Sequence, residues 1–395
     1  MGQYTSYYLY QKYETRGEQE AIPVYPNVYS IDADGTRERV VKLDEDPQCG
    51  YVPPTPDPQY RWVNIPITQD YVCDDCPDPQ YRWVKTDETT CVETPTGKKF
   101  VANYSDGKTL EVECNDNPTL KGSETNPKTY DYSKMTNAVI GNCVTTIGYF
   151  SFSNRISLTS VTIPNSVTEI SYNAFSSSYS LTSISIPSGV TSIGHDAFAG
   201  CTGLTSINIP SGVTTIDSST FSDCSGLTSV NIPSGVTSIG GHAFYQCSGL
   251  TSVTIPNSVT NISEYAFSRC ISLTSVIIPD SVTTVDGNTF AECTSLTSVT
   301  IPNSVTNIGY AAFYSCDGLT SVTIPDSVTS IDSMAFSYCS GLTNITVEAT
   351  TPPALGDNFV FNGSTCPIYV PAESVSAYKS VYPWSSYASR IQPIS

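Results

Sequence analysis

Basic residues are scarce in this sequence, and only two arginines and no lysine lie between Lys134 and Lys379. The 395 residues include 18 lysines and arginines against 37 aspartates and glutamates, a formal net charge of −19. The only arginines in the stretch between Lys134 and Lys379 are Arg155 and Arg269. Proteins that bind nucleic acid need a basic face to neutralise phosphates. The charge balance therefore argues against nucleic acid and against anionic membrane surfaces as partners.

Long apolar segments are missing as well. No stretch approaches the roughly 18 consecutive apolar residues of a transmembrane helix, so we expect no membrane insertion. The first residues, Met1 to Tyr8, lack the charged and apolar regions of a secretory signal peptide. A protein with this N-terminus that acts outside the cell has either lost a signal or left by another route, such as release of a virion by lysis.

Motifs for catalysis are also lacking. His195 and His242 are the only histidines, and no serine or cysteine beside them belongs to a nucleophile motif. No Gly-x-Ser-x-Gly elbow stands in a strand–turn–helix context, and glycine-rich phosphate loops are absent. We therefore predict a non-enzymatic protein with no cofactor and no bound metal, in which both histidines are ordinary surface residues.

What the sequence does contain is one motif that recurs at a constant period, of which Leu250–Cys270 is the clearest copy. Its prolines are Pro164, Pro187, Pro210, Pro233, Pro256, Pro279, Pro302 and Pro325, with Pro371 in phase. Its phenylalanines keep the same period from Phe152 through Phe175 and Phe198 to Phe336 and Phe359. Self-similarity at a fixed period of this length indicates a stacked solenoid.

Each copy predicts one short strand followed by a turn. In Val253-Thr254-Ile255 the apolar residues face inward and the threonine faces outward, and Pro256 ends the strand. We expect a short helical or 3₁₀ turn at Ala266-Phe267. One coil buries too little apolar surface to fold alone, so the coils must stack. Rungs from Ile140 to Val370 at this period would form a rod of about 50 Å.

The motif Leu-x-x-Val-x-Ile-Pro-x-x-Val-x-x-Ile-x-x-x-Ala-Phe-x-x-Cys resembles the 23-residue leucine-rich repeats of BspA-like surface proteins of anaerobic bacteria and their phages. The resemblance covers residues 138–371. It implies a right-handed curved leucine-rich-repeat solenoid with a parallel β-sheet on the concave face and short helical or 3₁₀ turns on the convex face. It also implies binding to other macromolecules rather than catalysis, and it leaves the ligand open.

Smaller elements flank the repeats. We predict strands at Val24–Ile31 and Arg39–Leu43, a hairpin of Phe100–Tyr104 with Thr109–Cys114 that covers the first coil, and an amphipathic helix at Ala372–Val381 that covers the last. The expected domains are a tyrosine-rich β segment (1–46), duplicated cysteine-containing β modules (47–95), a hairpin cap and linker (96–137), the solenoid (138–347) and C-terminal repeat remnants with a capping helix (348–395).

The cysteine-containing modules share a verbatim heptapeptide, Asp57–Val63 repeated as Asp78–Val84. Modules this short favour disulfide crosslinks, but the sequence does not choose a pairing for Cys49, Cys73, Cys76, Cys91 or Cys114. The tryptophans of the two copies would suit sugar stacking. We prefer the interpretation that the aromatic and arginine side chains form small cores. These are Tyr60, Arg61, Trp62, Tyr81, Arg82 and Trp83.

Two columns of the repeat decide what the solenoid exposes. Seven cysteines lie one coil apart from Cys201 to Cys339, and Ser178 holds the same column one coil earlier, which predicts small buried side chains with free thiols. The residues around the phenylalanine turn differ from coil to coil. Exposed tyrosines with mixed polar neighbours are typical of recognition surfaces. The candidate contact residues are Tyr172, Tyr245, Tyr265, Arg269, Tyr310, Tyr314 and Tyr338.

These observations favour a non-enzymatic recognition or adhesion protein, displayed on a bacterial surface or virion exterior, that binds a host or bacterial surface protein or a glycan. One alternative is a structural virion or filament component that docks to an assembly, or to its own copies, through residues 1–135. Another is a glycan-binding module, because the outward strand residues form a flat, uncharged, hydroxyl-rich face.

Overall fold

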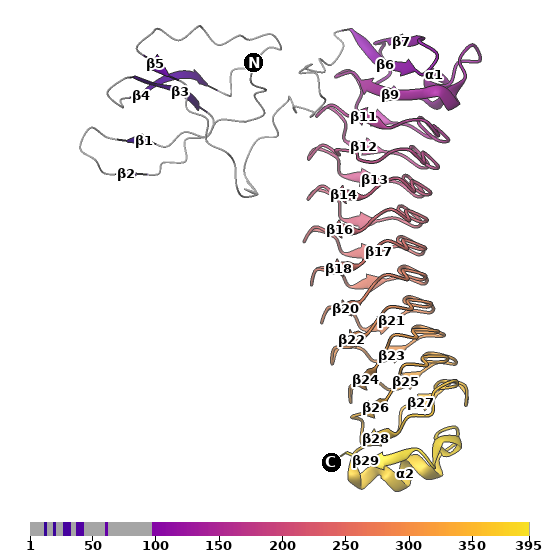
Figure 1. Cartoon of the computed structure of the whole chain (residues 1–395). Coiled ribbons are helices and arrows are strands. Elements are labelled where there is room, and N and C mark those ends of the chain that lie inside the picture. The colour runs from indigo at the N-terminus through magenta and orange to yellow at the C-terminus, as the bar shows by residue number, and fades with distance from the viewer. Residues whose placement is uncertain are drawn as a thin grey trace. The chain divides into compact units, whose positions relative to one another are not determined.

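The computed structural model describes residues 97–394 and, before them, the backbone of five short strands (Figure 1). The chain divides into two compact units, residues 1–93 and 94–395; the finer boundaries expected from the sequence stay predictions. In the first unit β3 pairs antiparallel with both β4 and β5. Its strands are β1 (Lys12–Tyr13), β2 (Gln19–Glu20), β3 (Asn27–Asp32), β4 (Arg37–Lys42) and β5 (Tyr60–Arg61).

Most of the cysteine-containing modules lie outside the described residues. The strands predicted at 24–31 and 39–43 are present as β3 and β4. The backbone of Tyr60 and Arg61 forms β5. Outside the described part lie the side chains of these two residues, together with Trp62, Tyr81, Arg82, Trp83, Cys49, Cys73, Cys76 and Cys91.

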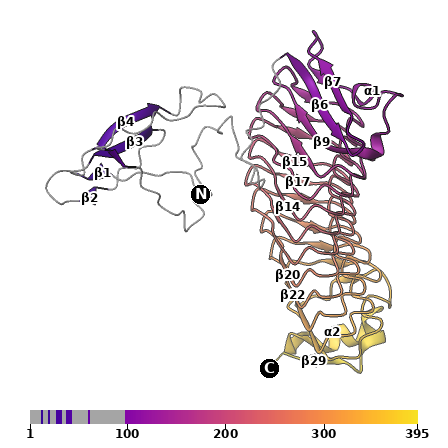
Figure 2. The same cartoon turned by 45° about the horizontal axis from the view of Figure 1, so that its top comes forward.

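The second unit is a parallel β-solenoid, and Figure 2 shows its coils side by side. Most of the predicted strands pair in parallel with a copy in a neighbouring coil, as Val230 does with Val253. The copy at residues 183–186 forms no strand. These strands are β9 (Met135–Ile140), β11 (Ser160–Thr162), β14 (Ser206–Asn208), β16 (Ser229–Asn231), β18 (Ser252–Thr254), β20 (Ser275–Ile277), β22 (Ser298–Thr300), β24 (Ser321–Ile324), β26 (Asn344–Val347), β28 (Ile368–Val370) and β29 (Ile391–Pro393).

A second column of two-residue strands follows the proline turn, where the sequence predicted only a return path. Asn261-Ile262, for example, pairs in parallel with Ser238-Ile239. This column comprises β8 (Thr119–Leu120), β10 (Thr146–Ile147), β12 (Glu169–Ile170), β13 (Ser192–Ile193), β15 (Thr215–Ile216), β17 (Ser238–Ile239), β19 (Asn261–Ile262), β21 (Thr284–Val285), β23 (Asn307–Ile308), β25 (Ser330–Ile331) and β27 (Ala354–Leu355).

The phenylalanine turn is a chain of linked β-turns, and between residues 141 and 371 it contains no helix. Backbone N–H groups alternate in direction: Tyr245 donates to the His242 carbonyl of its own turn at 3.0 Å, whereas Phe244 donates to the Ala266 carbonyl of the next coil at 2.8 Å. Residues with positive φ, such as Tyr265 at 60°, turn their N–H groups toward the next coil. Bonding between coils therefore replaces the local bonding of a 3₁₀-helix.

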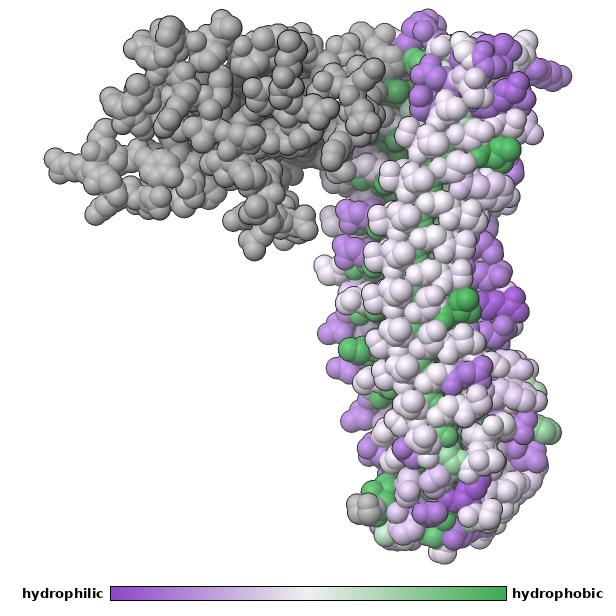
Figure 3. Space-filling view, in the orientation of Figure 1, coloured by the Kyte–Doolittle hydropathy of each residue, from purple (hydrophilic) through white to green (hydrophobic). Residues whose placement is uncertain are grey.

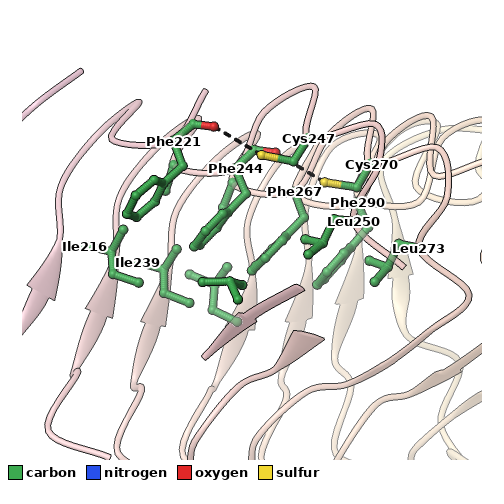
Figure 4. Close-up of a cluster of buried hydrophobic side chains, with 14 of the residues drawn as sticks. Ile216, Phe221, Ile239, Phe244, Cys247, Leu250, Phe267, Cys270, Leu273 and Phe290 are labelled. Atoms are coloured by element: carbon green, nitrogen blue, oxygen red, sulfur yellow. Dashed lines mark hydrogen bonds between the residues drawn. The ribbon is translucent and has the colours of Figure 1, made fainter. Parts of the chain in front are cut away.

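Stacked phenylalanine rings form the centre of the core, as Figure 4 shows for several coils. Neighbouring rings lie 5.1 to 5.8 Å apart and within 16° of parallel from Phe152 onward. The prediction that Phe359 belongs to this column is wrong, because its side chain is 47% exposed and Phe361 stacks on Phe336 instead. This coil contains extra residues, which shift the register. Ile331 pairs with Leu355, one position later than the partner expected from the regular period.

The cysteine column is buried and its thiols are free, as predicted. Each thiol donates a hydrogen bond to a phenylalanine carbonyl of the preceding coil, as Cys247 does to Phe221 at 3.1 Å. Ser178 makes the same bond to Phe152 at 2.7 Å. Burial raises the pKa of every thiol from Cys201 to Cys339, to about 12 for Cys201. The column therefore satisfies backbone carbonyls inside the core and is not a set of reactive nucleophiles.

The first coil is covered by the predicted hairpin, β6 (Lys98–Tyr104) and β7 (Thr109–Glu113). Strand β6 pairs antiparallel with β9, and Phe100 packs edge-on against Phe152 at 5.6 Å. A disulfide joins Cys114 to Cys143. Residues 115–134, expected to be a linker, contain β8, α1 (Gly122–Thr125) and η1 (Tyr132–Lys134), because pairing of β8 with β10 extends the second strand column.

The last coil is covered by η2 (Ala372–Ser374), α2 (Val375–Ser380) and η3 (Trp384–Tyr387). Tyr378 and Trp384 are buried in this cap and donate hydrogen bonds to the Ala349 and Pro353 carbonyls. Strand β29 then adds a further parallel rung, with Ile391 opposite Ile368. No helix in the described part of the chain has the length and apolarity needed to cross a bilayer.

The corrected register predicts unequal effects of two neighbouring phenylalanine substitutions. Phe361→Ala should lower the free energy of unfolding by about 3–5 kcal/mol, because it opens a cavity in the stacked core. Phe359→Ala should cost less than about 1 kcal/mol, because its ring is largely exposed. Urea unfolding followed by circular dichroism measures both. Equal losses in the two variants would contradict the register described above.

The buried thiols predict alkaline destabilisation. An unfolded thiol ionises near its ordinary pKa of 9.0, whereas burial keeps the folded thiols protonated, so the unfolded state binds fewer protons above that pH. Stability should therefore be complete below about pH 9 and fall above it, by roughly 1.4 kcal/mol per thiol per pH unit. Urea midpoints between about pH 7 and pH 10.5 would show this fall.

Substitution by serine provides the control. Cys247→Ser and Cys270→Ser keep a hydroxyl that can bond the same carbonyl, as Ser178 does, but remove two titrating groups. The double variant should lose stability with pH less steeply, by roughly 2.7 kcal/mol per pH unit. An unchanged slope would show that the thiols do not control the alkaline transition.

Candidate functional site: the tyrosine hollow of the turns

Five of the seven predicted contact residues line one shallow hollow on the turns, with a volume of about 320 Å³. They come from three coils, and the wall is completed by residues of the intervening coil and by Met334 of the following coil. The lining residues are Tyr245, Tyr265, Ser268, Arg269, Asn288, Ala291, Glu292, Tyr310, Ala311, Tyr314 and Met334. We call this site the tyrosine hollow. Tyr338 borders it, with its ring edge-on to Tyr314 at 5.5 Å.

The turn geometry positions these side chains. Tyr265 and Arg269 both have positive φ, and their N–H groups donate to the carbonyls of Gly287 and Ala291 in the next coil at 3.2 and 2.8 Å. Their backbone is therefore fixed from the adjacent coil while the side chains point away from the core. Because each coil repeats this geometry, residue identity in these columns can vary without changing the fold.

An ion pair balances charge within the hollow. Arg269 Nε lies 3.1 Å from Glu292 Oε2, and hydrogen bonding to Glu292 raises the pKa of Arg269. The guanidinium also lies 5.8 Å from the centroid of the Tyr245 ring. Both partners are well exposed, so the pair adds little to stability. Its effect is to hold the arginine over an aromatic ring in a hollow without net charge.

His242 belongs to this cluster, although the sequence predicted an ordinary surface residue. Its ring stacks on Tyr265 at 4.7 Å and meets Tyr245 edge-on at 5.3 Å. Both histidines are exposed. His242 lies one repeat before Tyr265, in the same column. This spacing could have predicted that the two rings are neighbours. Within the described residues, no group of three or more His, Cys, Asp and Glu side chains is arranged to hold a metal ion.

Tyr172 lies apart from the tyrosine hollow. Its ring is edge-on to Phe150 at 5.3 Å and to Tyr149 at 6.5 Å. These two neighbours were not predicted from the sequence, although Tyr149 lies one repeat before Tyr172 in the same column. The structure therefore divides the seven predicted contact residues into a group of six and one residue in a separate aromatic cluster.

The strand face is rich in hydroxyl groups. Thr251 and Thr274 each donate a hydrogen bond to the threonine carbonyl of the preceding coil at 3.3 Å, and the pattern recurs along the solenoid. The visible surface in Figure 3 is mostly pale, with few strongly apolar side chains. These hydroxyls thus reinforce the backbone ladder, and their uniformity gives little basis for selecting a ligand.

Comparison with known proteins identifies the repeat. Residues 123–250 and 214–343 match the family described as BspA type leucine rich repeat region, in six copies. No curated protein matches the chain.

Solved structures of leucine-rich repeat proteins are similar to it. One from T. pallidum is 30% identical, with a TM-score of 0.39, and the match covers 46% of this chain and 83% of that one. One from Bacteroides ovatus is 24% identical, with a TM-score of 0.37 and coverage of 83% and 100%. A leucine rich cell surface protein from Faecalibacterium prausnitzii is 25% identical, with a TM-score of 0.33 and coverage of 72% and 96%.

Proposed function

Because the chain belongs to the BspA-type leucine-rich repeat family, we propose that it is a non-enzymatic recognition protein that binds a partner through the tyrosine hollow. The observation that carries this proposal is the convergence of four tyrosines and a charge-balanced arginine from neighbouring coils. Tyrosine and arginine are enriched at the energetically important centres of protein interfaces. The most suitable partner is a surface protein of the host or of another bacterium.

The electrostatics of the hollow favour a partner without strong charge. Because Arg269 is already paired with Glu292, the hollow offers no unpaired charge to an acidic or basic partner. The tyrosines offer apolar ring faces and hydroxyl groups, and Tyr310 is 50% exposed. Such side chains lose little conformational entropy when a partner covers them. Binding would therefore depend on ring contacts and hydrogen bonds.

Display outside a cell fits this proposal. Proteins of BspA type are typically associated with the cell surface. The tyrosine hollow lies on the outer turns of the solenoid, where a partner could reach it. Several copies on one surface would raise the effective affinity of a modest contact. Exposure on a cell surface or on a virion exterior would both provide this arrangement.

Substitution of two tyrosines tests the proposal. Tyr245→Ala with Tyr314→Ala should weaken binding of the strongest partner at least about tenfold, because it removes two ring contacts. The partner would first be selected by screening the full chain against arrays of host and bacterial surface proteins and glycans. Affinities of the variant and the parent would then be compared by biolayer interferometry.

The matched control is Tyr382→Ala, which removes a tyrosine that is 71% exposed in the C-terminal cap, outside the tyrosine hollow. This variant should bind as the parent does, and both variants should keep the parent's urea midpoint. If the double variant retains parental affinity, or if Tyr382→Ala weakens binding equally, the tyrosine hollow is not the binding site.

A further inference from the structure

A second hollow, of about 510 Å³, lies near the N-terminal end of the solenoid. Its walls come from α1, η1 and the first phenylalanine turn. The lining residues are Lys121, Gly122, Ser123, Asn126, Tyr132, Tyr149, Phe150, Ser153, Asn154 and Arg155. Two of them are basic and none is acidic, in a chain whose net charge is −19. We call this site the arginine hollow.

Arg155 holds the column position that serine or cysteine fills in later coils, and its side chain is only 2% exposed. Its guanidinium donates to the Ser153 carbonyl at 2.7 Å and to the Ser151 carbonyl at 3.3 Å. Longer contacts join it to the carbonyl and hydroxyl oxygens of Thr125. All of these acceptors are uncharged. Within the described part of the chain, Nε has no hydrogen-bond partner. These hydrogen bonds go to neutral groups, and no carboxylate among the described residues pairs with the positive charge of Arg155.

The contrast with Arg269 is informative, because that arginine is paired with Glu292. Burial lowers the pKa of Arg155 to about 10, so it remains charged at neutral pH. A buried charge is costly unless an opposite charge or strong hydrogen bonds compensate it. Arginine matches the planar geometry of a carboxylate well. An anionic group in the arginine hollow would therefore supply the missing charge.

The aromatic walls restrict the kind of anion. The Tyr132 ring centroid lies 5.0 Å from the Arg155 guanidinium carbon. Tyr149 and Phe150 are 67% and 50% exposed, which leaves two ring surfaces uncovered beside the charge. Asn126 and Asn154 add amide groups at the rim. An inorganic anion would use the charge alone, whereas a sugar ring carrying a carboxylate would use the charge, the rings and the amides together.

We propose that the arginine hollow binds an acidic saccharide, a uronic or sialic acid type of sugar. The carboxylate would lie near Arg155 and Lys121, and the apolar face of the sugar ring would pack against Tyr149 and Phe150. Because Arg155 is only 2% exposed, direct contact of the carboxylate with its guanidinium would require the Tyr132 ring to move aside. This site is separate from the tyrosine hollow, so a partner can bind either site without the other.

Titration of the full chain with galacturonic acid and N-acetylneuraminic acid tests the proposal, with the methyl ester of each sugar as the uncharged counterpart. Isothermal calorimetry should detect binding of at least one acid, with a dissociation constant of about 1 mM or lower, and at least tenfold weaker binding of its ester. Binding should weaken as salt rises, because charge attraction contributes to it.

Variants localise the binding. Lys121→Gln and Tyr149→Ala should each weaken it at least about fivefold, and both side chains are exposed, so the fold should be unaffected. Arg155→Lys keeps the charge but loses the planar donors, and it should weaken binding while the urea midpoint reports any loss of stability. Tyr179→Ala, at a tyrosine that is 48% exposed and outside the hollow, should leave binding unchanged.

Three results would overturn the proposal. The first is that neither acid binds up to about 50 mM, a concentration at which even millimolar affinity would be detected. The second is equal binding of acid and ester, which would remove the role of the charge. The third is that an acidic peptide or inorganic phosphate binds as tightly as both sugars, which would show a general anion site rather than a saccharide site.

Discussion

The contact between one coil and the next is the interaction on which this structure depends. Each coil contributes inward side chains and backbone hydrogen bonds from its two strand columns and its phenylalanine turn. Almost all of the groups that these bonds reach lie in the coils on either side. Stability in such an array is a sum of contacts between neighbours. Polar groups in the core follow the same rule, because the Cys247 thiol bonds a carbonyl of the preceding coil.

The strength of the repeat explains what the sequence could predict. The strand register and the buried cysteine column follow from side-chain periodicity, and the structure has both. The resemblance of the motif to the family is confirmed by the family match. Phe359 was misplaced because the coil after Val347 gains residues before Phe361, and periodicity cannot locate such an insertion. The linked β-turns were also missed, since their alternating backbone bonds depend on a neighbouring coil and not on local sequence.

The candidate sites were only partly predictable for a related reason. The tyrosines were found because they vary in an otherwise constant turn, and five predicted residues converge on the tyrosine hollow. The stacking of His242 on Tyr265 can be predicted only if one knows that residues of one column in successive coils are neighbours in space. The arginine hollow depends on α1 and η1, which come from a segment without repeats. Periodicity gives no information about α1 and η1.

Removal of one complete coil tests the dependence on neighbouring coils most directly. Deleting residues 248–270 joins Cys247 to Ile271 in register, and we predict a folded chain with one cooperative urea transition at a lower midpoint. Deleting only residues 248–259 breaks the register and should abolish that transition. Loss of folding on removal of the whole coil, or an unchanged transition after the partial deletion, would contradict this dependence.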